Sequence, residues 1–153
     1  MRVSDIMTRK VEIVAMQEPA ENAWNLMRQK RIHHLVVKNG GEIVGILSER
    51  DLGGKDRETF RQTNKVLNAM TAYAVKATPE MPVREAANLM RGWSIGCLPV
   101  LEDDKLVGIV TVSDLLSLLG RGAAKPPRWT LKRRAPRLSR PSAKKRVRAG
   151  AVR

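Results

Sequence analysis

Residues 35–51 read LVVKNGGEIVGILSERD, and residues 98–114 read LPVLEDDKLVGIVTVSD. Each stretch has a short apolar run, a polar turn and a second apolar run. Each then ends in a hydroxyl residue that aspartate follows three positions later. Apolar runs on both sides of a short polar turn predict a β-hairpin. The chain therefore contains one predicted hairpin twice.

The duplication extends well beyond the hairpin. At an offset of 63 residues, positions 3–52 align with positions 66–115 without a gap, and 17 of the 50 aligned pairs are identical. Chance alone would give only a few identities at one offset. A self-similar period of this length is the signature of a repeated structural unit, so we interpret the chain as two copies of one unit.

Each copy has the same local pattern. Pro19 and Pro82 suit the first turn of a helix, and apolar residues recur after both prolines at helical spacing. A second helix is expected after Ser48 in the first copy and after Thr111 in the second. The predicted unit is strand, helix, strand, strand, helix.

A unit of about 50 residues is too small to bury a sufficient core of its own. We therefore expect an α/β (α+β) fold in which two β-α-β-β-α repeats pack through their sheets. The expected organisation is a first repeat at 1–58, a connector at 59–65, a second repeat at 66–120 and a basic tail at 121–153.

The positive charge of the chain is concentrated in that tail. The formal net charge is +14, yet residues 121–153 hold 13 of the 29 Lys and Arg residues and none of the 15 acids. The remaining 16 basic and 15 acidic residues leave residues 1–120 at a net +1. A proline-containing tail of like charges is expected to be disordered, and it could attract nucleic acid without sequence selectivity.

Composition narrows the remaining classes. No apolar run approaches the ~20 residues of a membrane helix, and the single cysteine, Cys97, cannot form an internal disulfide. We expect a cytoplasmic protein with no membrane span and a buried, inert thiol. No nucleophile or acid–base pair stands in a recognisable catalytic context, so we expect neither an enzyme nor a required cofactor.

The motifs Ser48–Asp51 and Thr111–Asp114 allow two interpretations. A hydroxyl residue followed three positions later by an acid is a common helix capping box. The same geometry suits a nucleotide, because a helix N-terminus attracts phosphate and the carboxylate can accept both hydrogens of a ribose diol. The two interpretations are compatible.

The duplicated unit resembles the cystathionine-β-synthase-type (CBS) domain family. The resemblance rests on the Gly-x-x-Ser/Thr-x-x-Asp motif that ends each hairpin, and on the openings VSDIMT at 3–8 and VLNAMT at 66–71. It covers about residues 1–120. It implies a pair of repeats related by pseudo-twofold symmetry, with two clefts. In each cleft the hydroxyl and aspartate of one repeat meet early residues of the other. Such pairs commonly form flat dimers, so the resemblance also implies a homodimer.

The resemblance also implies a ligand and its contacts. Nucleotide-binding members hold AMP, ADP, ATP or a related adenosyl compound. The matching residues would be Asp51 and Asp114 at the ribose and Ser48 and Thr111 near the phosphate. The adenine would be lined by residues such as Val11, Ile13, Val75 and Ala77, with Ile32 and Ile95 nearby.

The phosphate end of the clefts departs from the family pattern. Several members carry two basic residues before the first hairpin strand. The first copy has His33 and His34 there, whereas the second has Gly96 and Cys97. If the histidines face phosphate, affinity should rise as the pH falls through ~6.5. The alternative is a pair of half-buried strand residues, and no metal site is expected.

Three functions remain open from the sequence. The first is a regulatory module that senses an adenine nucleotide and acts on another, unknown effector protein. The second is a nucleic-acid-associated protein that uses 121–153, with the repeats as a dimerisation platform. The third is a structural dimer without ligand.

Overall fold

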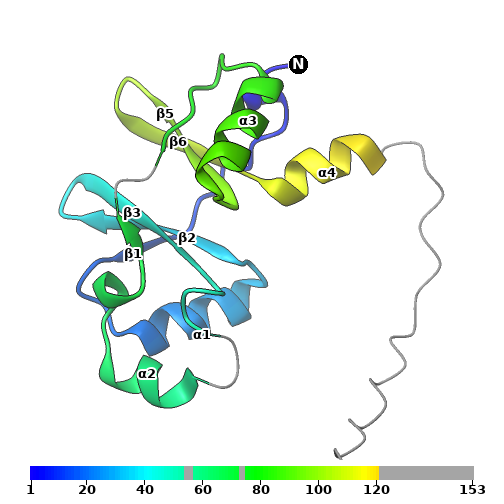
Figure 1. The fold of residues 1–153 in the computed structure, drawn as a ribbon. Coiled ribbons are helices and arrows are strands. Elements are labelled where there is room, and N and C mark those ends of the chain that lie inside the picture. Colours follow the sequence, from blue (N-terminus) through cyan, green and yellow to red (C-terminus); the bar gives the residue numbers. More distant parts are fainter. Residues whose placement is uncertain (54–56, 73–74, 121–153) are drawn as a thin grey trace, which may run out of the picture. The chain divides into compact units, whose positions relative to one another are not determined.

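The computed structural model describes residues 1–53, 57–72 and 75–120. Figure 1 shows the order of its elements. The first repeat and the connector contain a 3-10 turn η1 (Val3–Asp5), β1 (Ile13–Ala15), α1 (Ala20–Lys30), β2 (His34–Asn39), β3 (Glu42–Ser48) and α2 (Glu58–Thr63). The second repeat contains the turn η3 (Val66–Asn68), β4 (Thr71–Ala72), α3 (Val83–Trp93), β5 (Cys97–Glu102), β6 (Lys105–Thr111) and α4 (Val112–Gly120). The mixed α/β fold of two repeats is confirmed, while the tail expected at 121–153 lies outside the described residues.

The helices α1 and α3 occupy equivalent positions in the two repeats. Pro19 and Pro82 are their N-caps, and each helix ends at a left-handed residue, Arg31 or Ser94. The apolar side chains that recur along each helix are buried against the hairpin of the same repeat. Helical periodicity in the sequence therefore located the buried face of each helix correctly.

The two predicted hairpins are both present. Strands β2 and β3 pair antiparallel, as do β5 and β6, and each hairpin has a register shift at the same place, after Val37 and after Val100. The second turn places Asp103 and Asp104 at positive φ. Aspartate tolerates that region better than most residues do, which suits a two-residue hairpin turn.

The opening segment of each repeat packs against the other repeat. Thr8 exchanges two backbone hydrogen bonds with Ile109 of β6, and β4 pairs with β3 of the first repeat. Val3 is buried in the core of the second repeat, and Val66 in the core of the first. The two repeats are therefore joined by exchanged segments as well as by the connector.

Gly45 and Gly108 allow this exchange. A Cβ on Gly45 would lie 2.5 Å from the carbonyl oxygen of Thr71, and one on Gly108 would lie 2.7 Å from the sulfur of Met7. Real side chains do not approach so closely. Glycine at this position of the second hairpin strand therefore leaves room for the opening segment of the other repeat.

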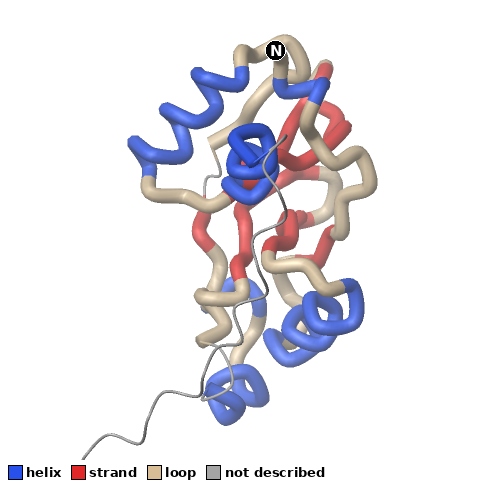
Figure 2. The backbone as a smooth tube through the Cα atoms, turned by 90° about the vertical axis from the view of Figure 1, so that its right-hand side faces the viewer, coloured by secondary structure: helices blue, strands red, loops and turns tan. Residues whose placement is uncertain are grey.

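The sheets of the two repeats contact one another through a small apolar cluster. Val36 and Ile46 of the first hairpin pack with Cys97 and Ile109 of the second. In the ribbon and tube views, α1 and α2 lie on the side of the first repeat's strands that faces away from the second repeat (Figures 1 and 2). The expectation that the repeats pack through their sheets is confirmed.

One predicted helix is absent. In the second repeat α4 begins directly after Thr111, but in the first repeat Ser48 is followed by turns, and the next helix, α2, begins only at Glu58. Gly53 adopts φ +76 in these turns. Glycine at positive φ ends a helical turn readily, which explains why the same motif does not start a helix here.

Candidate functional site

A cavity of about 1180 Å³ lies between the two repeats. Residues from the ends of both hairpins line it, together with residues of the exchanged opening segments and of the turn after α3. Its lining consists of Thr8, Lys10, Val11, Glu12, Ile32, His33, His34, Ile46, Ser48, Glu49, Arg50, Asp51, Thr71, Ala72, Val75, Trp93, Ser94, Ile95, Gly96, Cys97, Ile109, Thr111, Val112, Ser113 and Asp114.

Ten of the twelve residues predicted for a ligand site line this one cavity. They are Ser48, Asp51, Thr111, Asp114, His33, His34, Val11, Val75, Ile32 and Ile95. These residues come from both repeats, so folding gathers both copies of the hydroxyl–aspartate motif around a common space.

Ile13 and Ala77 lie elsewhere. Ile13 is 41% exposed on β1, and Ala77 is 1% exposed in the core of the second repeat. The 63-residue offset explains the result for Ala77, because its equivalent is Val14, which is buried in the core of the first repeat. Neither Ile13 nor Ala77 therefore presents a surface to this cavity.

The motif in the first repeat forms a closed pair of hydrogen bonds. The backbone N–H of Ser48 donates to Oδ2 of Asp51 at 2.7 Å, and the N–H of Asp51 donates to the Ser48 hydroxyl oxygen at 3.2 Å. This is the bonding of a capping box, although a turn follows it and no helix begins there. Oδ1 of Asp51 accepts no hydrogen bond within the described part of the chain.

The motif in the second repeat is more tightly closed. The N–H of Thr111 donates to Oδ2 of Asp114 at 2.7 Å, and the hydroxyl of Thr111 lies 2.8 Å from the same oxygen. The N–H of Asp114 donates back to that hydroxyl at 3.3 Å. Asp114 thus caps the first turn of α4 while it also lines the cavity. The hydrogen bonds of a capping box are present in both motifs, but a helix directly follows only the second. These bonds exclude neither motif as a ligand contact.

The adjacent histidines both reach the cavity but differ in their surroundings. His33 is exposed, and its Nδ1 lies 2.5 Å from Oε2 of Glu49. His34 is half-buried, and its Nε2 lies 2.7 Å from where a Cβ on Gly96 would stand. Burial lowers the pKa of His34 below its ordinary value, and the neighbouring His33 lowers it further.

Cys97 occupies the position equivalent to His34 and also lines the cavity. It is buried in β5, and burial raises the pKa of its thiol to about 12, with the nearby Asp51 carboxylate adding to the rise. A thiol with such a pKa holds its proton at neutral pH and is a poor nucleophile. Among the described residues, no group of three or more His, Cys, Asp or Glu side chains could hold a metal ion.

Several cavity residues were not predicted as ligand contacts. Thr8 and Thr71 are equivalent in the repeat, as are Ile46 and Ile109, and all four belong to identical pairs. Identity between the repeats was therefore a usable signal for them. Four charged residues carried no comparable signal, because their partners at the 63-residue offset differ in type: Lys10, Glu12, Glu49 and Arg50.

Comparison with known proteins relates the whole described fold to one family. The family model for the CBS domain matches residues 3–52 and 66–121. A CBS domain-containing protein of Bacillus subtilis, YhcV, is 31% identical over 119 residues, which cover 74% of this chain and 81% of that protein.

Two solved structures show the same arrangement. A protein with CBS domains from Burkholderia ambifaria aligns with a TM-score of 0.74 and 27% identity, covering 83% of this chain and 99% of that one. The CBS domain pair of protein MJ0100, solved with 5′-methylthioadenosine and S-adenosyl-L-methionine, aligns with a TM-score of 0.69 and 26% identity, covering 79% of this chain and 97% of that one.

Proposed function

This chain belongs to the CBS domain family, and from that membership we propose that it is a regulatory module that binds an adenosyl ligand between its two repeats. The ligand is an adenine nucleotide or a related adenosyl compound. The module performs no catalysis and requires no cofactor, and its output is a change in a partner protein.

The observation that carries this proposal is the composition of the cavity. Asp51 and Asp114, one from each repeat, line it together with apolar side chains from both repeats. Each aspartate keeps one carboxylate oxygen free of hydrogen bonds among the described residues. A free carboxylate oxygen is a strong acceptor for a ribose diol. The apolar lining, which includes Ile32, Ile95 and Val75, suits a purine.

The related pair MJ0100 supports the adenosyl part of the ligand, since its structure was solved with two adenosyl compounds. Its likeness to this chain spans both repeats and therefore the elements that line the cavity. Two copies of the hydroxyl–aspartate motif allow up to two ligands in this chain, and we propose the motifs as their ribose ends.

A ligand in this position would regulate by contacting both repeats at once. If the repeats can adopt two arrangements, the ligand shifts the population toward the one that it binds more tightly. We propose that a partner protein receives this change.

The first test is calorimetric titration of the full chain with adenosine, AMP and ATP. Asp51→Asn and Asp114→Asn should each lower affinity at least about tenfold at their own site, because a hydrogen bond to a charged acceptor contributes roughly 1.5–3 kcal/mol. Asp104→Asn is the matched control, because Asp104 lies in the β5–β6 turn and tolerates asparagine at positive φ.

The outcomes separate the three functions. Saturable binding that is lost in the aspartate variants supports the sensor. Binding of none of the three compounds refutes it and leaves the structural dimer. If the chain instead binds RNA or DNA in a manner that collapses with salt, the basic residues at 121–153 are its functional part.

We also propose that the module is a homodimer that uses α4. This helix has no buried residue, and Leu119 is 83% exposed, with Leu116 and Val112 exposed on the same helix. Leu115 of this helix packs against the core of the second repeat, so the exposed apolar residues form its outer face. An exposed apolar helix face is a common interface between copies of one chain. Leu116→Glu with Leu119→Glu should convert the dimer to a monomer in analytical ultracentrifugation, and an unchanged mass would refute this interface.

No helix in the described residues is both long and apolar enough to cross a membrane.

A further inference from the structure

We infer that the cavity selects an adenosyl compound whose 5′ end is neutral or cationic, and that it discriminates against ATP. This inference rests on the proposed function and names the ligand class within it. Three observations support it. They are the charges of the lining, the structure that follows each hydroxyl–aspartate motif, and the surroundings of the histidines.

The first observation is an excess of carboxylates. Four carboxylates line the cavity, Glu12, Glu49, Asp51 and Asp114, against two permanent cations, Lys10 and Arg50. The histidines aside, two cations against four carboxylates leave a formal charge of −2. A polyphosphate carries several negative charges and would meet net repulsion there.

The positions of these charges strengthen the effect. Glu12, Asp51 and Asp114 are half-buried, whereas Lys10 and Arg50 are both exposed. The side chain of Glu49 is 41% exposed. Exposed charges are screened by water and salt more than half-buried ones. The field inside the cavity is therefore dominated by its carboxylates.

Cations from outside the lining do not reverse this balance. Lys30 approaches Glu12, with Nζ 3.8 Å from Oε1, and counting it still leaves three cations against four carboxylates. Neither Asp51 nor Asp114 forms an ion pair with a cation of the described residues. The two aspartates that would hold the riboses therefore stay uncompensated.

The second observation concerns the expected phosphate positions. A helix N-terminus would have favoured a phosphate, but no helix begins after Ser48. At Thr111 a helix does begin, and Asp114 already places a carboxylate at that end. A carboxylate in that place interacts favourably with the positive end of the helix dipole and repels a second anion.

The third observation concerns the histidines, the remaining candidates for phosphate. Nδ1 of His33 is already engaged with Glu49. The pKa of His34 is lowered by burial and by His33, so at neutral pH its ring is uncharged. His34 therefore offers no positive charge to a polyphosphate at pH 7.5, and the ring of His33 already has a carboxylate as its partner.

The test is a competition on the full chain at 0.15 M salt. Calorimetry first gives the affinity for 5′-methylthioadenosine, and adenosine, S-adenosyl-L-methionine, AMP and ATP are then used to displace it. Displacement matters, because the 13 basic residues of 121–153 can bind ATP without filling the cavity. We expect ATP to displace at least about tenfold more weakly than adenosine does, as repulsion of a multiply charged anion implies.

Two results overturn the inference in different ways. If ATP displaces as well as adenosine or better, the discrimination is wrong while the proposed function stands. If none of these compounds binds, the proposed function fails and the inference falls with it.

A charge variant tests the cause. The double variant Glu12→Gln with Glu49→Gln removes two negative charges from the lining with little change of shape. It should raise the affinity for ATP relative to that for adenosine at least about fivefold. Glu42→Gln with Glu102→Gln is the matched control, because both residues are exposed at the ends of hairpin strands and neither lines the cavity. Circular dichroism checks that both variants fold. An unchanged ratio in the cavity variant refutes the electrostatic origin.

Discussion

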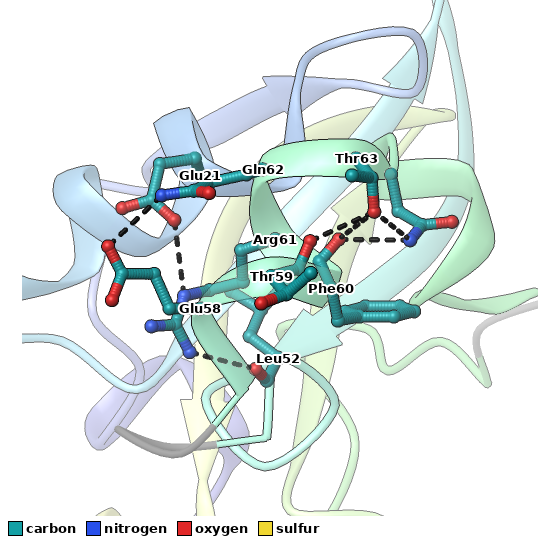
Figure 3. Close-up of polar contacts among 9 residues, drawn as sticks. Glu21, Leu52, Glu58, Thr59, Phe60, Arg61, Gln62 and Thr63 are labelled. Carbon is teal, nitrogen blue, oxygen red and sulfur yellow. Dashed lines mark hydrogen bonds and ion pairs between the residues drawn. The ribbon is translucent and has the colours of Figure 1, made fainter.

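Replacing Arg61 by methionine should destabilise the first repeat and loosen the segment that carries Asp51. Arg61 lies on α2, and its side chain is 4% exposed. Its Nε donates to Glu21 of α1 at 3.2 Å, and its Nη1 donates to the carbonyl oxygen of Leu52 at 3.3 Å (Figure 3). Its guanidinium also lies 4.2 Å from the centre of the Trp24 ring. Arg61 therefore ties α1, α2 and the residue after Asp51 together.

The expected loss of unfolding free energy can be worked out from the partner group of each contact that Arg61 makes. The carbonyl of the buried Leu52 would lose its charged donor, which costs about 1–3 kcal/mol. The loss of a desolvated cation–π contact with Trp24 adds about 1–2 kcal/mol. Glu21 is 32% exposed and can return to water, so its lost ion pair adds little. Methionine keeps most of the apolar volume, and the expected total is about 2–4 kcal/mol.

The assay is urea unfolding of the full chain followed by far-ultraviolet circular dichroism. The control is Arg28→Met, because Arg28 is exposed and lies 5.7 Å from the same ring, so its loss should cost under about 1 kcal/mol. Adenosine affinity should fall in Arg61→Met as well, since Leu52 directly follows Asp51. Equal stability of Arg61→Met and the wild type would show that this contact does not hold the repeat together.

Three further perturbations test the exchanged segments and the buried titratable groups. Gly108→Ala should lower the free energy of unfolding by about 1–3 kcal/mol, because the added methyl group displaces Met7. The control Gly92→Ala has open space around it and should stabilise α3 by roughly 0.5–1 kcal/mol. Similar urea midpoints for both variants would argue against a close approach of Met7 to Gly108. His34 has a lowered pKa in the folded state, so the unfolded chain binds the proton more readily and stability should fall as the pH drops below ~6.5. His34→Gln should flatten that fall in unfolding at pH 7.5 and 5.5, and an identical pH dependence would contradict the assignment. Cys97, with its thiol pKa of about 12, should react with Ellman's reagent at pH 8 only after unfolding, and rapid native labelling would show that the thiol is accessible.

The local elements could be read directly from the sequence because short-range patterns determine them. Helices begin at Pro19 and Pro82, and both hairpins turn at the predicted polar segments. The prediction failed after Ser48, where the motif is present but the helix is not. The hydrogen bonds of a capping box involve four residues, whereas a helix also requires that the following residues continue it, and Gly53 does not.

The cavity was predicted in part for the same reason. The repeated motifs identified Ser48, Asp51, Thr111 and Asp114, because both copies carry the same pattern at the same offset. Two of the residues expected at the adenine, Ile13 and Ala77, lie outside the cavity. Their positions depend on how strand alternation continues through irregular opening segments, and no local pattern settles that.

The sequence alone predicts the duplication, the positions of α1, α3, α4 and both hairpins, and the residues that carry the hydroxyl–aspartate motifs, but not the position of α2. Periodicity and repetition are properties of neighbouring residues and of one constant offset, so they need no coordinates. Only the tertiary structure decided that the opening segment of each repeat pairs with the other, and that carboxylates outnumber cations in the cavity. Both results depend on contacts between residues far apart in the chain. Thr8 meets Ile109 and Glu12 shares a cavity with Asp114 because the two sheets pack together.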